Sequence, residues 1–294
     1  MSICRQSLRL EYICSLLIFI TGCAEKVQLV TNQKDFNNQP QLHNAEPNSV
    51  EAAQIEKPSK KSTFIEKAKV DFSNWPNIVF EDTKDTFSAT NNLTALLLAG
   101  AVSVVMNQDA DNEIAEHFEE HRHLDNFKDE SVNVLGHPGT HFAAAGLWYA
   151  LSAENQDELN NQRASIMLRA LSVNWAVTMS LKAIRNNETP NGKNWAWPSG
   201  HTSSSFTVAS VLDEFYGHNI GIPAYAAASF AAYRMMDSGD HWASDVVFGA
   251  TLGWVVGHSI GGKHKQPELA GYKISPHIVT NSGTAMGISL QKRF

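Results

Sequence analysis

Two segments of the sequence contain side chains that could carry out phosphate chemistry. The first is 197–201, Trp-Pro-Ser-Gly-His, which comes directly before a helical pattern that begins at Thr202. Pro198 and Gly200 end any preceding helix, so the backbone N–H groups of the last three residues should lie at a helix N-terminus. Those groups and the positive end of the helix dipole favour an anion. His201 beside an anion site is suited to phosphate chemistry.

The second segment, 233–245, supplies a histidine, a carboxylate and a guanidinium group. His241 and Asp245 are four residues apart, so at the start of a helix they share one face. The Asp245 carboxylate can then accept a hydrogen bond from one imidazole nitrogen and stabilise the imidazolium form. The other nitrogen is left free to act as a nucleophile. Arg234 adds a planar, permanently charged group that fits phosphate oxygens.

Apolar residues at helical spacing predict the elements that must position these side chains. None of the predicted helices is an uninterrupted apolar run of 18 residues, which favours a soluble all-α helical bundle. Gly261-Gly262 should end the last helix. A short C-terminal β-hairpin is predicted from strands 272–279 and 284–290 with a turn at 281–283. The expected helices are 86–106, 140–153, 164–185, a helix from 202 to 212, 222–236 and 242–260.

The charged segment 109–129 is expected to be a surface helix or loop. Within it, His117 to His121 reads His-Phe-Glu-Glu-His, which fits the inverted zinc-protease pattern. The segment is acidic, lacks an apolar face and is followed by no further ligand that stands out, so a zinc site is not predicted here, and no cofactor is expected. The net charge of −7 argues against nucleic acid as a partner.

The N-terminus has the features of a bacterial lipoprotein precursor. An apolar run at 12–20 is too short to span a bilayer, and it leads into Ile-Thr-Gly-Cys at 20–23, which resembles a lipobox. The resemblance implies a signal peptide over 1–22 and a lipid on Cys23. Ala24 follows the cysteine, which by the same resemblance implies the periplasmic face of the outer membrane.

Residues 23–75 are polar and lack apolar periodicity, so we expect a disordered tether. The compact domain is expected over 76–294. Cys4 and Cys14 lie in the expected signal peptide, which leaves the mature chain without a disulfide. The oligomeric state is not predicted.

Pro-Ser-Gly-His at 198–201, followed by Arg234 and by His241-x-x-x-Asp245, resembles the type 2 phosphatidic acid phosphatase superfamily. This superfamily also contains bacterial class A acid phosphatases and vanadium haloperoxidases. Its first motif is a lysine, six residues and Arg-Pro, and its third is Ser-Arg, five residues, His, three residues and Asp. The resemblance covers residues 86–262. It implies a helical bundle of this family and a metal-independent hydrolase of phosphomonoesters or lipid phosphates in the cell envelope.

The resemblance also implies a role for each matching residue. His241 would attack phosphorus and form a phosphohistidine, and Asp245 would orient it. His201 would protonate the leaving oxygen and then activate water. The phosphate oxygens would be held by a further group of residues, namely Lys182, Arg234, Thr189, the Ser199 side chain and the Gly200 N–H.

The sequence departs from the family pattern at three places, one of which is Tyr233, which precedes Arg234 where the family has serine. Lys182 plus six residues leads to Thr189-Pro190, so threonine replaces a phosphate-binding arginine, at a cost of about 2–4 kcal/mol of transition-state binding. Six residues instead of five separate Arg234 from His241, an insertion that Ser238-Gly239 could absorb. Arg185 or Lys193 could compensate for the missing arginine.

These departures leave three functions open. The first is a lipid-anchored phosphatase. The second is a catalytically impaired envelope lipoprotein with a binding or scaffolding role. The third is a vanadate-dependent haloperoxidase, which is disfavoured because its oxyanion cage needs the missing arginine. The tryptophans Trp195, Trp197 and Trp242 either line an apolar substrate pocket or pack around the site.

Overall fold

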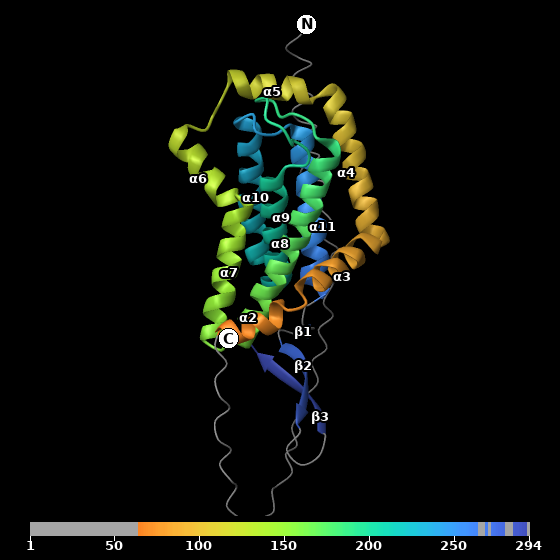
Figure 1. Ribbon diagram of the computed structural model, residues 1–294, viewed down its shortest axis with the longest axis vertical. Coiled ribbons are helices and arrows are strands. Elements are labelled where there is room, and N and C mark those ends of the chain that lie inside the picture. The colour runs from red at the N-terminus through yellow and green to blue at the C-terminus, as the bar shows by residue number, and fades with distance from the viewer. Residues whose placement is uncertain (1–63, 264–267, 270–271, 280–284, 293–294) are drawn as a thin grey trace, which may run out of the picture. The chain divides into compact units, whose positions relative to one another are not determined.

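The computed structural model describes residues 64–263, 268–269, 272–279 and 285–292. All of them belong to one compact unit, Ser59–Phe294. The predicted signal peptide, Cys23 and most of the predicted tether lie outside the described residues. The helices of the described part (Figure 1) are α2 (Phe64–Phe72), α3 (Trp75–Ser88), α4 (Thr90–Asp109), α5 (Asp111–Glu120), α6 (Asn126–Gly136), α7 (Pro138–Glu154), α8 (Glu158–Arg185), α9 (Gly200–Tyr216), α10 (His218–Asp237) and α11 (Ala243–Lys263).

Three helices, α8, α9 and α11, pack against one another at the centre of the bundle. Helix α7 packs on α8, α10 packs on α9, and α4 packs on α11. In Figure 1 these long helices run side by side, while α5 lies across their upper ends and α2 and α3 cross near the lower ends. The core contains Leu171 of α8, Val211 of α9 and Leu252 of α11, all of which are almost fully buried. The all-α helical bundle expected from the sequence is therefore confirmed.

Glycines on α11 allow it to approach α9 closely. Gly249, Gly253 and Gly257 follow one another at four-residue intervals and face the Ser199–Ser210 stretch of α9 and its N-cap. A Cβ atom on Gly249 would lie 2.8 Å from the Ser199 carbonyl oxygen, and one on Gly253 would overlap the backbone of Ser203. These two helices carry the two halves of the expected site, so the glycines set how closely those halves approach.

We expect Gly253→Ala to lower the free energy of unfolding by about 3 kcal/mol, because the added methyl group meets backbone atoms that cannot move aside. The matched control is Gly146→Ala on α7, where a Cβ atom meets nothing within 4 Å. That change should be neutral or should stabilise the protein by about 0.5–1 kcal/mol, because alanine favours helix more than glycine does. Urea denaturation of both variants measures the difference. Equal effects at the two positions would contradict the close packing.

Several element boundaries differ from the expected ones. Helix α8 begins at Glu158 instead of Ala164, because the side chain of Asp157 caps it by accepting from the Asn160 N–H at 3.0 Å. Helix α11 continues through Gly261-Gly262, which were expected to end it. Helix α2 lies within the expected tether, yet its Phe72 packs on Tyr149 with ring centroids 5.3 Å apart. The helical domain thus includes residues before 76.

The C-terminal residues form a three-stranded antiparallel sheet in the order β1-β2-β3. It consists of β1 (Glu268–Leu269), β2 (Tyr272–Val279) and β3 (Ala285–Lys292). Tyr272 pairs with Lys292 and Val279 with Ala285. The two long strands fall where the sequence predicts a hairpin, and its expected turn at 281–283 lies outside the described residues.

Candidate active site

The two segments that carry the predicted site residues, 197–201 and 233–245, meet at one end of the bundle. Helices α8 and α10 end there, and α9 and α11 begin there, at the top of Figure 1. The Ser199 N–H donates to the Asp245 carbonyl oxygen at 3.1 Å, which joins the two segments through their backbones. The structure thus brings these two segments into direct contact.

His241 lies in the short connection between α10 and α11 and is 8% exposed. Its Nδ1 is 3.4 Å from Oδ2 of Asp245, which is fully buried and also accepts from the Trp242 N–H at 3.0 Å. The other oxygen of Asp245 is buried without a hydrogen-bond partner among the described residues. Burial lowers the pKa of His241, although the hydrogen bond to Asp245 opposes this. His241 is therefore held neutral, with Nε2 as the nitrogen not engaged by the carboxylate.

His201 lies in the first turn of α9, and its Nε2 is buried without a hydrogen-bond partner among the described residues. Its ring lies 5.1 Å from that of His137, the N-cap residue of α7. Burial lowers the pKa of His201 to about 3, with further contributions from His137, His241 and Arg234. An unpartnered buried nitrogen is unusual, and here it is available to a ligand that can exchange a proton with it.

Helix α9 begins at Gly200, two residues before the start predicted at Thr202, and Ser199 is its N-cap. The Ser199 hydroxyl accepts from the Thr202 N–H at 3.4 Å and from the Thr202 hydroxyl at 3.0 Å, and Ser199 is fully buried. This side chain is thus engaged in capping the helix. A Cβ atom on Gly200 would lie 3.8 Å from Cε of Lys182, so a cation lies beside the helix N-terminus.

Lys182, in the last turn of α8, is 9% exposed. Its ammonium group donates to the carbonyl oxygens of Trp195 and Ala196, the latter at 3.1 Å. Trp195 has a φ of 69°, a left-handed conformation that is uncommon for a tryptophan. Burial lowers the pKa of Lys182 to about 8, while the charge of Asp245 opposes the shift. Lys182 is therefore still mostly charged at neutral pH and holds the loop that precedes α9.

Arg234, near the end of α10, directs its guanidinium group at two carboxylates. Nε and Nη2 donate to the two oxygens of Asp129 on α6, at 2.8 and 2.9 Å, and Nη1 donates to Asp240. Burial opposes the charge on Arg234, but the two aspartates raise its pKa. The pKa of Asp240 is held below its usual value despite burial, because Lys193, Asn191 and Arg234 all bind it. The expected phosphate-binding arginine is thus bound by carboxylates.

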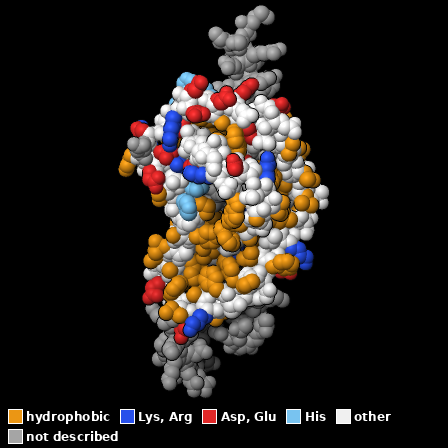
Figure 2. All heavy atoms as spheres, turned by 45° about the horizontal axis from the view of Figure 1, so that its top comes forward, with side chains coloured by type: hydrophobic (Ala, Val, Ile, Leu, Met, Phe, Trp, Pro, Cys, Tyr) orange, Lys and Arg blue, Asp and Glu red, His pale blue; other side chains and the backbone are white. Residues whose placement is uncertain are grey.

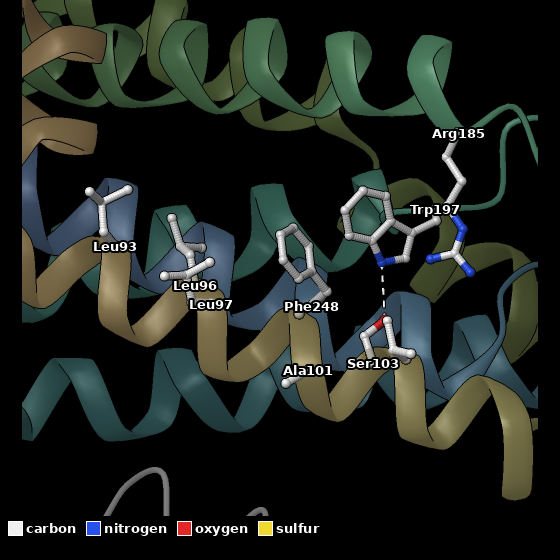
Figure 3. Close-up of a pocket in the computed structure, with 10 residues that line it drawn as sticks. Leu93, Leu96, Leu97, Ala101, Ser103, Arg185, Trp197 and Phe248 are labelled. Carbon is white, nitrogen blue, oxygen red and sulfur yellow. Dashed lines mark hydrogen bonds between the residues drawn. The ribbon is translucent and has the colours of Figure 1, made fainter.

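Thr189 and the two proposed substitutes for the missing arginine are also engaged. The Thr189 hydroxyl donates to Asn191 at 2.7 Å and accepts from the Lys193 N–H at 2.9 Å, within its own loop. The Lys193 ammonium pairs with Asp240 at 2.8 Å. The guanidinium carbon of Arg185 lies 5.2 Å over the Trp197 ring, next to α4 (Figure 3). Gly239 has a φ of 69° in the turn that accommodates the extra residue before His241.

Three further aspartates support the site and were missed by sequence reasoning. Asp111, on α5, is buried and accepts from the Ser244 N–H at 2.9 Å and from the Ser244 hydroxyl, which stabilises the first turn of α11. Asp237 accepts from the backbone of the segment before α6. Asp129 pairs with Arg234. Of the three, only Asp237 lies inside the segment 233–245 that the sequence analysis singled out, so only its position was a signal.

The other sequence alternatives have definite positions as well. Trp242 donates from its indole to the Glu188 carbonyl oxygen at 2.7 Å and so ties two loops together, whereas Trp197 donates to Ser103 on α4. His117 and His121 lie on and just after α5, and no group of three or more His, Cys, Asp or Glu side chains in the described residues is placed to hold a metal ion.

Comparison with known families and structures decides the relationship. The family model of the PAP2 superfamily matches residues 180–261, which contain the ends of all four helices at the site. A crystal structure of a transmembrane PAP2-type phosphatidylglycerolphosphate phosphatase from Bacillus subtilis superposes with a TM-score of 0.52 at 17% identity, over 60% of this chain and 96% of that one. Residues 180–261 of this chain are therefore a PAP2 superfamily segment.

One curated relative matches a shorter part of this chain. Lipid A 1-phosphatase of Porphyromonas gingivalis is 37% identical over 65 residues, which are 21% of this chain and 15% of that protein. The match thus spans a small part of the relative's length. Among the described residues, one helix, α4, is long and apolar enough to cross a membrane by length and composition alone.

Proposed function

We propose that this PAP2 protein is a metal-independent phosphatase that hydrolyses a phosphomonoester or lipid phosphate through a phosphohistidine on His241. The observation that supports this most directly is the pairing of His241 Nδ1 with the buried Asp245. It leaves Nε2 as the nucleophile, the charge of Lys182 acts on the His241 ring, and Lys182 lies beside the N-terminus of α9. Such positive groups stabilise the charge that develops on the equatorial phosphate oxygens.

In the proposed first step, Nε2 of His241 attacks phosphorus and the bond between phosphorus and the leaving oxygen breaks. His201 gives its proton to that oxygen, and an alcohol departs. In the second step, His201 removes a proton from water, which attacks the phosphohistidine and breaks the P–N bond. Inorganic phosphate leaves and both histidines return to their starting states. Asp245 keeps the His241 ring oriented and stabilises its positive charge.

Lipid phosphates are the substrate class that the surface and the relatives favour. Figure 2 shows histidine side chains at the edge of a hollow bordered by apolar side chains, with charged side chains gathered toward the upper end. The two relatives are named as phosphatases of lipid A and of phosphatidylglycerolphosphate. We place this protein in the bacterial cell envelope, on the periplasmic face of the outer membrane, held by a lipid on Cys23. Labelling by a fatty acid that is lost in Cys23→Ser tests the anchor.

The activity itself is tested by phosphate release from phosphatidic acid and from a nitrophenyl phosphate, without added metal and in the presence of a chelator. Release from either substrate supports the proposal. No release by folded protein from a broad panel of phosphomonoesters would contradict it. Activity that appears only with vanadate, peroxide and halide would instead identify a haloperoxidase.

A second candidate is a catalytically impaired protein with a binding or scaffolding role. It is favoured by a specific observation: Arg234 is bound on both sides by Asp129 and Asp240, and Thr189 replaces the other expected arginine. A phosphate group must displace a carboxylate before it can use Arg234. The loss of one charge-assisted contact costs about 2–4 kcal/mol in a transition state.

We expect Asp129→Asn to raise kcat/KM about tenfold, because it removes the charge that competes with phosphate for Arg234. Asp240 still pairs with Arg234 in the variant, so the buried guanidinium keeps a counter-ion. The matched control is Asp125→Asn, which removes an exposed carboxylate one turn earlier and should change little. A fall in kcat/KM on Asp129→Asn would show that the pair supports the active arrangement.

We expect kcat/KM to be greatest below pH 6.5. This quantity reports the free enzyme, which needs His241 neutral and His201 protonated. The pKa of His241 is lowered from 6.5, so its acid limb lies below that value. The pKa of His201 is about 3, so the protonated fraction of His201 falls steadily as the pH rises above that value. A profile from pH 4 to 9, corrected for the second ionisation of the substrate phosphate near pH 6, checks this. An optimum above pH 8 would overturn the assigned roles.

A further inference from the structure

An apolar groove of about 510 Å³ lies between α4 and the core, where Trp197 and Phe248 line it. Figure 3 shows Leu93 and Leu97 of α4 along it, Phe248 and Trp197 on the opposite wall, and Arg185 at one end. The volume lies within the range of ligand sites in proteins, roughly 300–1,000 Å³. None of the catalytic or phosphate-binding residues lines it.

Arg185 is a cation without a carboxylate partner among the described residues. Its one hydrogen bond there is a long one, 3.4 Å from Nη2 to the Asn107 side-chain oxygen, and its guanidinium stacks over the Trp197 ring. Arg169, on the same helix, is bound by both oxygens of Asp82 at 2.8 and 2.9 Å. Arg185 therefore keeps donors available for an anion at the end of the groove.

The groove continues into the outer face of α4, which is apolar and uncharged. Leu97, Leu98 and Val105 are 73%, 64% and 58% exposed. No charged residue occurs from Thr90 to Gln108, and only 11% of the helix's most apolar stretch is buried. A core helix of a soluble protein would bury this face, whereas α4 leaves it outward. Its 20 residues span about 30 Å, close to the thickness of bilayer hydrocarbon.

The groove is apolar along its length and has a cation at one end, which complements the acyl chain and the anionic headgroup of a membrane lipid. Its apolar length lies along α4, and Arg185 lies at the end of α8, where the helix gives way to the polar loop 186–197. We propose that the groove binds one acyl chain of an anionic phospholipid, with the lipid phosphate on Arg185. The lipid is a bound membrane component and not the substrate, because a phosphodiester such as phosphatidylglycerol has no phosphomonoester to hydrolyse. The site is thus independent of the proposed activity.

Contact quenching of Trp197 tests this site in the full chain. The protein is mixed with phosphatidylcholine vesicles that contain phosphatidylglycerol with brominated acyl chains, and indole fluorescence is recorded. The component that disappears in Trp197→Phe belongs to the groove, whatever the other tryptophans do. We expect bromine to quench this component. In Arg185→Gln, the lipid concentration needed for half-maximal quenching should rise about tenfold, because a charge-assisted hydrogen bond is lost.

Two further variants sharpen the result. Leu97→Glu places a carboxylate in the groove at an exposed position and should abolish the quenching. Lys84→Gln removes an exposed cation of α3 and should leave it unchanged. Equal quenching by brominated phosphatidylcholine alone would overturn the choice of an anionic lipid, and no effect of Arg185→Gln would overturn the assignment of the phosphate to Arg185. Self-association that shields Trp197 from bromine would assign the groove to a second copy of the chain and overturn the lipid.

Discussion

His241→Ala is expected to reduce kcat for phosphate release by roughly 10⁴–10⁶-fold, the loss seen when the nucleophile of a covalent mechanism is removed. The reason is specific to this residue: Nδ1 is held by the buried Asp245, so only Nε2 of His241 is presented to phosphorus. No other histidine among the described residues faces a buried carboxylate four residues later in the chain. Phosphate release from phosphatidic acid measures the loss.

The matched control is His218→Ala at the opposite end of α10. His218 is exposed and pairs with Asp213 at 2.9 Å, so its removal should leave kcat unchanged. A direct test of the covalent step is to quench the reaction of radiolabelled substrate in alkali, in which a phosphohistidine survives. Label should be retained by the wild-type protein and by His218→Ala but not by His241→Ala. If His241→Ala kept a tenth of the activity, the nucleophile would have to be another group.

The sequence predicts the framework of the site because both segments carry local signals. Pro198 and Gly200 limit where α9 can begin, and the four-residue spacing brings His241, just before α11, to Asp245 in the first turn of that helix. The structure begins α9 at Gly200, two residues before the start predicted at Thr202, with Ser199 as its N-cap. Such signals act within a few residues along the chain and so can be interpreted without knowing the fold.

The partners of Arg234 could not be predicted in this way. Asp129 lies 105 residues before Arg234, in a segment with weak apolar patterning, and only the packing of α6 on α10 brings the two together. Asp240 is adjacent to His241, but the sequence does not show whether its carboxylate faces solvent or the guanidinium. Ion pairing over such distances depends on how the helices pack, which periodicity does not specify. Whether carboxylates already bind a phosphate-binding arginine such as Arg234 can therefore be learned only from the structure.

The start of α8 shows a related limit. Its first turns, 158–163, are polar and read as a loop, yet two of these polar side chains are buried. Asn161 donates to the Tyr149 carbonyl oxygen at 3.1 Å, and the guanidinium of Arg163 lies 4.8 Å from the centre of the Tyr216 ring. A buried polar residue with a distant partner looks the same in sequence as an exposed one. The capping residue Asp157 was the available signal for the true start.

His201→Ala should have an effect that depends on the leaving group. On phosphatidic acid, which releases a basic alkoxide, we expect kcat/KM to fall by roughly 10²–10⁴-fold, the contribution of general acid catalysis. On a nitrophenyl phosphate, which releases a weakly basic phenolate that needs no proton, the loss should be less than about tenfold. The quantity kcat/KM is the right one because it reports steps up to departure of the alcohol, before His201 acts on water.

This contrast separates proton donation from phosphate binding. The Nε2 atom of His201 is buried without a partner among the described residues, which suits an atom that must meet the leaving oxygen. If His201 only held the phosphate or the start of α9, both substrates would lose activity equally, and that result would refute its role as the acid. His141→Ala, which removes a neighbouring histidine 3.1 Å from Ser204, should affect neither substrate strongly.

Because the pKa of His201 is about 3 in the free protein, the dianionic phosphate must raise that pKa on binding before the proton can be delivered.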